Sequence, residues 1–188
     1  MGSFGPNNGA TFASDGTVGT IAVTNASNAG ASDNSYATLV LLLGESGQYL
    51  KATGFSFAIP LDATIAGILV EIERSTTVLN SVTDLSVKLV KAGAIVGSEK
   101  AAAGQWPTSD AYASYGDAAS DLWGTTWTPA EINASTFGVV VSPTAALAAT
   151  AQIDHVRVTI GYTGSNRPGA LTSRLIVGSG MSTAESLK

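Results

Sequence analysis

The chain has 188 residues, no cysteine, a single histidine and a formal net charge of −5. The lack of cysteine excludes disulfides, thiolate metal sites and a cysteine nucleophile, and one histidine excludes a multi-histidine metal centre. The negative charge argues against a nucleic acid as the main partner. Only 12% of the residues are charged, about half the ~25% that is usual in soluble domains. We therefore expect a surface of small neutral side chains, much of it available for partners.

Residues 1–17 are rich in Gly, Asn and Ser and contain two isolated aromatic residues, Phe4 and Phe12. A segment of this composition buries little apolar surface by itself. We expect an extended N-terminal arm whose contacts with a partner are made by Phe4 and Phe12.

From residue 18 to residue 163, short segments of β-branched and aromatic residues alternate with Gly, Asn, Pro and Ser. Alternation of apolar and polar side chains with a period of two is typical of half-buried strands. Strands are predicted at 20–24, 36–43, 53–59, 68–73, 84–89, 95–96, 137–141 and 156–162. Because no segment shows sustained helical periodicity, this pattern predicts an all-β protein, an antiparallel, jelly-roll-like β-sandwich of about eight strands.

Three details of these strands are also predicted. The run 36–43 is almost continuously apolar, which is typical of a strand buried on both faces. In the strand 84–89, Leu85 and Val87 are expected on one face and Asp84 on the other. Ala92-Gly93 predicts a tight hairpin.

The long segment 101–135 interrupts the strand pattern and holds all three tryptophans. Within it, Thr128-Pro129-Ala130-Glu131 matches a capping box with proline at the first helical position. This combination predicts a short helix.

The strand pattern stops after Thr163, and residues 164–169 have the composition of a linker. We therefore expect three regions: an N-terminal arm (1–17), the sandwich (18–163) and a C-terminal arm (164–188). The last region carries three basic residues and one acidic residue, and 171–177 has the pattern of one further strand, on this subunit or a neighbour. We expect this arm to dock on a partner through Arg167, Arg174, Leu175, Ile176 and Val177.

His155 is the one candidate for a catalytic imidazole. Adjacent residues of a strand point to opposite faces, so Asp154 cannot orient the ring of His155. We interpret His155, beside Arg157 and Thr159, as a polar-face residue of an exposed or interface strand. No nucleophile motif accompanies it, and we expect the protein not to be an enzyme.

Four acidic residues lie in or near the long segment: Asp110, Asp117, Asp121 and Glu131. Loop carboxylates are Ca²⁺ ligands, although their spacing here does not match an EF-hand loop. We interpret these four residues as solvent-exposed loop acids, so no cofactor is expected. Binding of Ca²⁺ is the alternative.

Five aromatic residues crowd the same segment: Trp106, Tyr112, Tyr115, Trp123 and Trp127. Large aromatic side chains bury roughly 150–250 Å² each, and this favours a place in the core or in an interface. Aromatic rings also stack on the faces of sugars, so contact with a glycan is the alternative.

A resemblance to a known family is carried by GFSFAIP (54–60), ATIAGI (63–68), VEIER (70–74), TDLSVKLVK (83–91), LWG (122–124), WTP (127–129), FGVVV (137–141) and IDHVRVTIGYT (153–163). This series resembles a β-sandwich module of tailed-bacteriophage structural proteins and of some bacterial surface proteins. The resemblance covers roughly residues 20–163 and includes no catalytic motif. It implies a structural role in the virion and supplies no catalytic residues.

The sequence thus predicts a virion protein, most simply a capsid decoration (cement) protein whose arms bind the major capsid protein and stabilise the shell. A homo-oligomer is expected, with a trimer favoured, and neither nucleic acid nor a membrane is an expected partner. A place in the tail, neck or fibres is the nearest alternative. A carbohydrate-binding adhesin that contacts host-surface glycans is the alternative from a different class.

Overall fold

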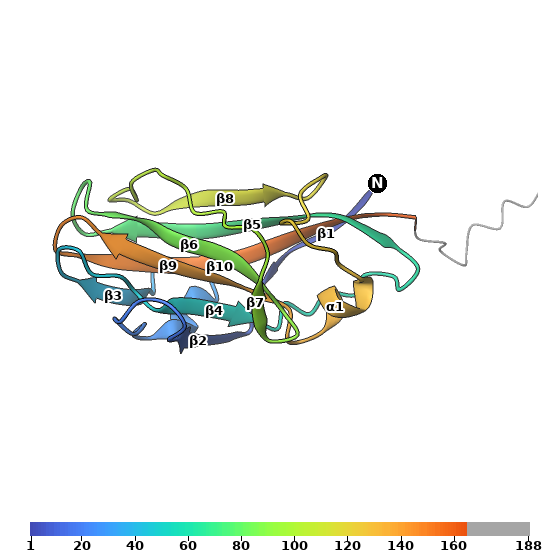
Figure 1. Ribbon diagram of the computed structural model, residues 1–188, viewed down its shortest axis with the longest axis horizontal. Helices are drawn as coiled ribbons and strands as arrows, with labels where there is room; N and C mark the ends of the chain where they lie inside the picture. The colour runs from blue at the N-terminus through green and yellow to red at the C-terminus, as the bar shows by residue number, and fades with distance from the viewer. Residues whose placement is uncertain (165–188) are drawn as a thin grey trace, which may run out of the picture.

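The computed structural model describes residues 1–164, which form two antiparallel five-stranded sheets packed face to face (Figure 1). Sheet A contains β1 (Gly2–Asn8), β3 (Ala37–Leu41), β5 (Thr64–Thr76), β8 (Ala111–Asp117) and β10 (Ala149–Thr163). Sheet B contains β2 (Thr11–Asp15), β4 (Tyr49–Thr53), β6 (Val82–Lys91), β7 (Ala94–Val96) and β9 (Gly138–Ala145). The short helices η1 (Ala26–Ala29) and α1 (Pro129–Asn133) lie in connections between strands. The predicted all-β, antiparallel sandwich is confirmed.

The strand order is β1–β10–β5–β8 in sheet A and β2–β4–β9–β6–β7 in sheet B. β3 pairs with the first part of β10, on the same edge that pairs with β1 further along. Apart from the β6–β7 hairpin, every successive strand lies in the other sheet. Within residues 1–164, no helix is long and apolar enough to cross a membrane.

The core lies between the sheets and is built by alternation along the strands. Ile68, Val70 and Ile72 on β5 and Val156 and Val158 on β10 are fully buried. Removing each such aliphatic side chain from water stabilises the fold by roughly 1.5–3 kcal/mol. Alternation therefore fixes which face of each strand is turned inward.

The N-terminal segment is part of the sandwich, so the expectation of a free arm at 1–17 was wrong. β1 pairs with β10 at the edge of sheet A, and β2 pairs with β4 at the edge of sheet B. Phe4 and Phe12 pack against the core, and the ring of Phe4 lies edge-on to that of Phe57, with 6.0 Å between centroids. An edge strand buries only every second side chain. A segment with few apolar residues is therefore able to form such a strand. Both phenylalanines are therefore partly buried in the sandwich itself, and contact of their exposed parts with a partner stays a prediction.

Three predicted strands differ in detail. Residues 20–24 form only isolated bridges, at Ile21 and Thr24. In the strand predicted at 53–59, residues 54–59 lie outside both sheets and Gly54 and Ser56 have positive φ, although Phe55 is buried. β3 was expected to be covered on both faces, but Val40 is 68% exposed because this edge strand is packed on its inner side only.

β6 contains a register shift between Asp84 and Ser86 in its pairing with β9. An extra residue on one strand of an antiparallel pair reverses the alternation beyond it. Asp84 is therefore turned inward and Leu85 is 37% exposed, the reverse of what strict alternation predicted.

The long segment 101–135 contains β8, which was not predicted from the sequence. It also contains α1, which was predicted from the capping box. The capping box is confirmed: Thr128 Oγ1 accepts from the backbone N–H of Glu131 at 3.3 Å, and Glu131 Oε2 accepts from that of Thr128 at 2.8 Å. The hairpin at Ala92-Gly93 is also confirmed, and both residues have positive φ.

The contacts predicted for the C-terminal arm lie outside the described residues. These are Arg167, Arg174, Leu175, Ile176 and Val177, together with the strand predicted at 171–177. They stay predictions.

Candidate functional site

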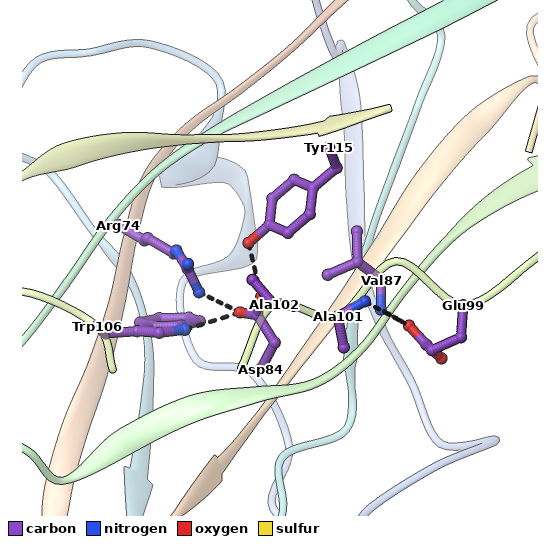
Figure 2. Close-up of polar contacts among 8 residues, drawn as sticks. All are labelled: Arg74, Asp84, Val87, Glu99, Ala101, Ala102, Trp106 and Tyr115. Atoms are coloured by element: carbon purple, nitrogen blue, oxygen red, sulfur yellow. Dashed lines mark hydrogen bonds and ion pairs between the residues drawn. The ribbon is translucent and has the colours of Figure 1, made fainter. Parts of the chain in front are cut away.

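A buried ion pair joins the two sheets: Arg74 on β5 contacts Asp84 on β6 (Figure 2). The arginine side chain is 6% exposed and the aspartate side chain is fully buried. Asp84 also accepts from the indole N–H of Trp106 at 2.8 Å, from the Tyr115 hydroxyl at 2.9 Å and from the backbone N–H of Ala102 at 2.9 Å. Both carboxylate oxygens therefore have partners, which is the condition under which a buried charge is tolerated.

Aromatic rings enclose this pair. The Arg74 guanidinium lies 4.8 Å from the centroid of the Trp106 ring and 5.7 Å from that of Tyr115. Burial raises the pKa of Tyr115, so its hydroxyl stays protonated and donates to Asp84. The cluster is closed to substrate, and its role is to hold the sheets in one relative position.

The remaining tryptophans are core residues as well. Trp123 is fully buried and its indole N–H donates to the Ile68 carbonyl at 2.9 Å. Trp127 is buried against Phe137, and its indole N–H donates to the Leu122 carbonyl at 3.1 Å. Of the five aromatic residues considered for glycan contact, Trp106, Tyr115, Trp123 and Trp127 are thus buried. Their rings are not available to stack on a sugar, and the core interpretation is favoured; Tyr112 is half-buried.

The four acids considered as calcium ligands have separate protein partners: Asp110 with the hydroxyls of Tyr36 and Ser75, Asp117 with Ala119 and Ser120, Asp121 with Lys100, and Glu131 with Lys91. No three His, Asp or Glu side chains in residues 1–164 are grouped so as to hold a metal ion. The arrangement of this part of the chain therefore does not favour the Ca²⁺ alternative.

His155 lies on the outer face of sheet A, but it is covered and only 6% exposed, because Gly30 forms a bridge with it. Its Nδ1 lies 2.7 Å from the Tyr112 hydroxyl. The Tyr112 ring lies over the Arg157 guanidinium at 4.0 Å, and Arg157 binds both carboxylate oxygens of Glu71 at 3.0 Å. Of the two alternatives, an exposed strand is excluded at this position, because the loop at 30–35 folds over the sheet.

Burial lowers the pKa of His155, and Arg157 lowers it further. Burial also raises the pKa of Asp154, which accepts from the backbone N–H groups of Asp33 and Asn34 at 3.5 and 3.2 Å. Two buried atoms of this cluster, Nε2 of His155 and Oε2 of Glu73, have no hydrogen-bond partner. The bridge from Gly30 to His155 and the hydrogen bonds from Asp33 and Asn34 to Asp154 fasten the loop to the sheet.

A shallow cavity of about 440 Å³ lies on the outer face of sheet B. Its lining residues are Asp15, Thr17, Tyr49, Lys88, Gly93, Ala94 and Ile95. Its volume is within the range of small-ligand sites. The lining combines one cation, one anion, hydroxyl groups and one aromatic residue. These groups are better suited to binding a small polar ligand than to catalysing a reaction.

Three turns lie side by side at one end of the sandwich (left in Figure 1). Large aliphatic side chains on these turns and at the end of β3 are exposed. We call this surface the apolar end; it consists of Val40, Leu42, Leu43, Val78, Leu79 and Leu147. These side chains are 39–71% exposed. The turns are joined by backbone hydrogen bonds, from Ala146 to Ser81 at 2.7 Å and from Gly44 to Ala145 at 2.8 Å.

The apolar end has almost no charge. In residues 38–46, 76–83 and 143–151 the one charged residue is Glu45, whose carboxylate accepts from the backbone N–H of Leu42 at 2.8 Å. Single exposed aliphatic side chains are ordinary, but several of them on uncharged turns that are hydrogen-bonded to one another are typical of an interaction surface. The apolar run at 39–43 was the sequence signal for this surface, and it was misread as a strand buried on both faces.

In the described part of the chain, the fold and its surfaces define a β-sandwich with closed interior clusters and an exposed apolar end. Comparison with protein-family models, curated proteins and solved structures finds no match to this chain.

Proposed function

We propose that this chain is a structural protein of a tailed-bacteriophage virion and that it acts by binding other virion proteins. The observation that carries the proposal is the apolar end, an uncharged aliphatic surface on three turns that are held together by backbone hydrogen bonds. Such a surface is suited to lasting contact with protein, since little polar solvation is lost when it is covered.

Two further features support this role. The His155 cluster and the Arg74–Asp84 cluster are closed by their own contacts, and this favours a binding protein over an enzyme. The alternation of successive strands between the sheets is the kind of connection found in jelly-roll-like sandwiches, and we propose that architecture here. The sequence resemblance to virion modules points the same way.

We further propose a place on the capsid as a decoration protein, in symmetric clusters such as trimers, in contact with the major capsid protein. Repeated copies on a symmetric shell need only modest affinity per contact, because many contacts act together. A position in the tail, neck or fibres is the alternative.

The test is the copy number of the chain in purified virions, measured by quantitative peptide mass spectrometry against the major capsid protein. A copy number of the same order as that of the capsid protein supports decoration of the shell. A few copies or tens of copies support a tail, neck or fibre position and overturn the decoration role. Absence from the particle overturns the virion proposal.

A second candidate function is binding of a host-surface glycan. The cavity beside Lys88 favours it, because charged and hydroxyl side chains around a shallow hollow can form hydrogen bonds with a sugar. Calorimetric titration with host polysaccharide tests it, with Lys88→Ala as the cavity variant. Heat of binding that is lost in Lys88→Ala supports this function, and no heat with the wild-type protein removes it.

A further inference from the structure

We infer that the cavity on the outer face of sheet B binds a sugar that carries a carboxylate, a uronic acid, and that Lys88 binds this carboxylate. The inference rests on the second candidate function, glycan binding at the cavity, and adds the chemical class of the sugar. It does not depend on the place of the protein in a virion.

Lys88 is a cation without a partner in the described part of the chain. The other lysine and arginine side chains of residues 1–164 each form an ion pair; they are Lys51, Arg74, Lys91, Lys100 and Arg157. Lys88, on β6, forms neither an ion pair nor a side-chain hydrogen bond with residues 1–164, and it is half-buried in the lining of the cavity. Its ammonium has three hydrogen-bond donors and no acceptor. It is therefore free to bind an anion.

The groups beside Lys88 are apolar or already bound. Tyr49, Val90 and Val140 form a small buried cluster apart from the main core. Val140 is the cross-strand neighbour of Lys88, and the Tyr49 hydroxyl lies 2.6 Å from the hydroxyl of Ser86. Attraction between charges is stronger beside apolar groups than in water. A carboxylate that reaches Lys88 is therefore held more strongly than it would be on an open surface.

The other charged groups near the cavity have direct partners. Asp15 pairs with Lys51 at 3.3 Å. Glu99 accepts from the hydroxyl of Ser86 and from three backbone N–H groups, and in the described chain it forms no ion pair with Lys88. Lys88 is thus the one charge at the cavity without a direct partner in residues 1–164. A ligand with one carboxylate matches this single ammonium.

Two acceptors in the lining favour hydroxyl groups on the same ligand. Thr17 Oγ1 donates to Asp15 Oδ1 at 2.8 Å, so the lone pairs of the threonine oxygen remain to accept. Asp15 Oδ2 accepts from Lys51 at 3.3 Å, and a carboxylate oxygen has room for a further donor. The ligand that satisfies the lining has a carboxylate for Lys88 and O–H donors for Asp15 and Thr17. A uronic acid combines these groups on one ring.

The size and charge of the cavity agree with one such ring. Its volume of about 440 Å³ lies in the range of small-ligand sites. A ligand with several negative charges, such as an acidic peptide or a phosphate, is disfavoured because like charges repel and Asp15 lines the same cavity. A sugar with a single carboxylate turns neutral hydroxyl groups toward Asp15 and avoids this repulsion.

The first test is a chemical-shift titration of the ¹⁵N-labelled full-length protein with D-glucuronate and D-galacturonate. D-Glucose and D-galactose are the matched probes, since each differs from its uronate only by a hydroxymethyl group in place of the carboxylate. We expect the uronates to bind at least about tenfold more tightly than the neutral sugars, because the contact with Lys88 is charge-assisted. The amides of Gly93, Ala94 and Ile95 should shift, since these residues line the cavity.

Equal affinity for uronates and neutral sugars overturns the inference and leaves glycan binding at the cavity standing. No binding of either uronate also overturns it. The calorimetric titration with host polysaccharide then decides the second candidate function separately. Acetate, which has a carboxylate and no hydroxyl, should bind about tenfold more weakly than the uronates. If acetate binds as tightly, the site recognises a bare carboxylate, such as an acidic side chain of a protein, and the assignment to a sugar is overturned.

Variants of Lys88 test the role of its charge. Lys88→Gln should weaken binding of the uronates at least about tenfold and leave the affinity for the neutral sugars unchanged. Lys88→Arg keeps the charge and should retain binding. Lys100→Gln is the matched control, because the Lys100 ammonium pairs with Asp121 at 2.6 Å and does not line the cavity. Unchanged affinity of Lys88→Gln, or an equal loss in Lys100→Gln, overturns the inference.

Discussion

Asp84 on β6 and Arg74 on β5 form an ion pair that joins the two sheets in the interior of the sandwich. A bulge in β6 determines where this ion pair forms, because the register shift after Asp84 turns its carboxylate inward. Once inside, Asp84 receives hydrogen bonds from Trp106, Tyr115 and Ala102, which belong to the long segment between β7 and β9. One inverted residue thus binds three positions of this long segment.

The first prediction concerns this pair. Asp84→Asn leaves the Arg74 guanidinium buried without a counter-charge, and we expect it to lower the free energy of unfolding by roughly 3–5 kcal/mol. Arg74→Met/Asp84→Asn, which removes both charges, should be more stable than Asp84→Asn alone. Urea denaturation followed by tryptophan fluorescence measures both. Asp15→Asn, which breaks the half-exposed pair with Lys51 at 3.3 Å, is the control and should cost less than about 1 kcal/mol. A loss that small for Asp84→Asn would contradict the interpretation.

The second prediction concerns Glu99, which receives the backbone N–H of Val87 and the hydroxyl of Ser86, both at 2.6 Å, just beyond the bulge (Figure 2). Burial raises the pKa of Glu99, but these hydrogen bonds outweigh burial and the net pKa lies below its usual 4.5. The carboxylate therefore contributes stability that is present above pH 4.5 and is lost as the pH falls through the lowered pKa. Glu99→Gln should be less stable than wild type at neutral pH, and the difference should shrink below pH 4.5. Thermal denaturation from pH 3 to pH 7 tests this, and a constant difference across that range would refute it.

The third prediction concerns His155. Its pKa lies below the usual 6.5 because burial, and then Arg157, disfavour the charged ring. The unfolded chain therefore takes up the proton first as the pH falls, and the stability present above pH 6.5 is lost as the pH falls through the lowered pKa. The charged groups facing the ring are Glu71 and Glu73 on β5, and Asp154 and Arg157 on β10, with the Tyr112 hydroxyl on β8.

The matched variant is His155→Gln, which keeps a polar side chain and cannot titrate. The difference in unfolding free energy between wild type and His155→Gln should depend on pH between about pH 7 and pH 5, in favour of the wild type at the higher pH. The raised pKa of Asp154 acts in the opposite direction, with stability gained as the pH falls. Asp154 is present in both proteins, so the comparison isolates the histidine. Equal pH profiles for the two proteins would show that His155 does not titrate in this way.

The fourth prediction concerns Gly161 on β10. A Cβ atom there would lie well inside van der Waals distance of the backbone carbonyl of Ala118, which cannot move aside as a flexible side chain can. Gly161→Ala should therefore destabilise the fold by a few kcal/mol, about the upper range for single substitutions. Gly104→Ala is the control, since nothing lies within 4 Å of its Cβ. Differential scanning calorimetry distinguishes a large fall in Tm for the first from little change for the second; equal Tm values would contradict the expected clash.

Several elements were predictable because their signals are local. The capping box at Thr128 and the hairpin at Ala92-Gly93 each depend on a few adjacent residues. The inward faces of β5 and β10 follow from a period of two over many residues. This alternation can be recognised without knowledge of the neighbouring strands, and the alternate apolar residues of β5 and β10 are buried in the core.

The features that were missed depend on distant partners. The N-terminal segment has few apolar residues and becomes ordered by pairing with β10 and β4. β8 has the composition of a loop and becomes a strand by pairing with β5. The burial of His155 depends on the loop around Gly30, 125 positions away in the chain.

The sequence by itself determined the class of fold and the places of the main core strands, since alternation and turn residues act over short distances. It also determined the low charge and the aliphatic run at 39–43. Only the tertiary structure decided which of those aliphatic side chains are exposed, because an edge strand has one packed face and its neighbours are chosen by the whole topology. The bulge that turns Asp84 toward Arg74 was decided in the same way, by hydrogen bonds from Trp106 and Tyr115 that form only when the sheets are packed together.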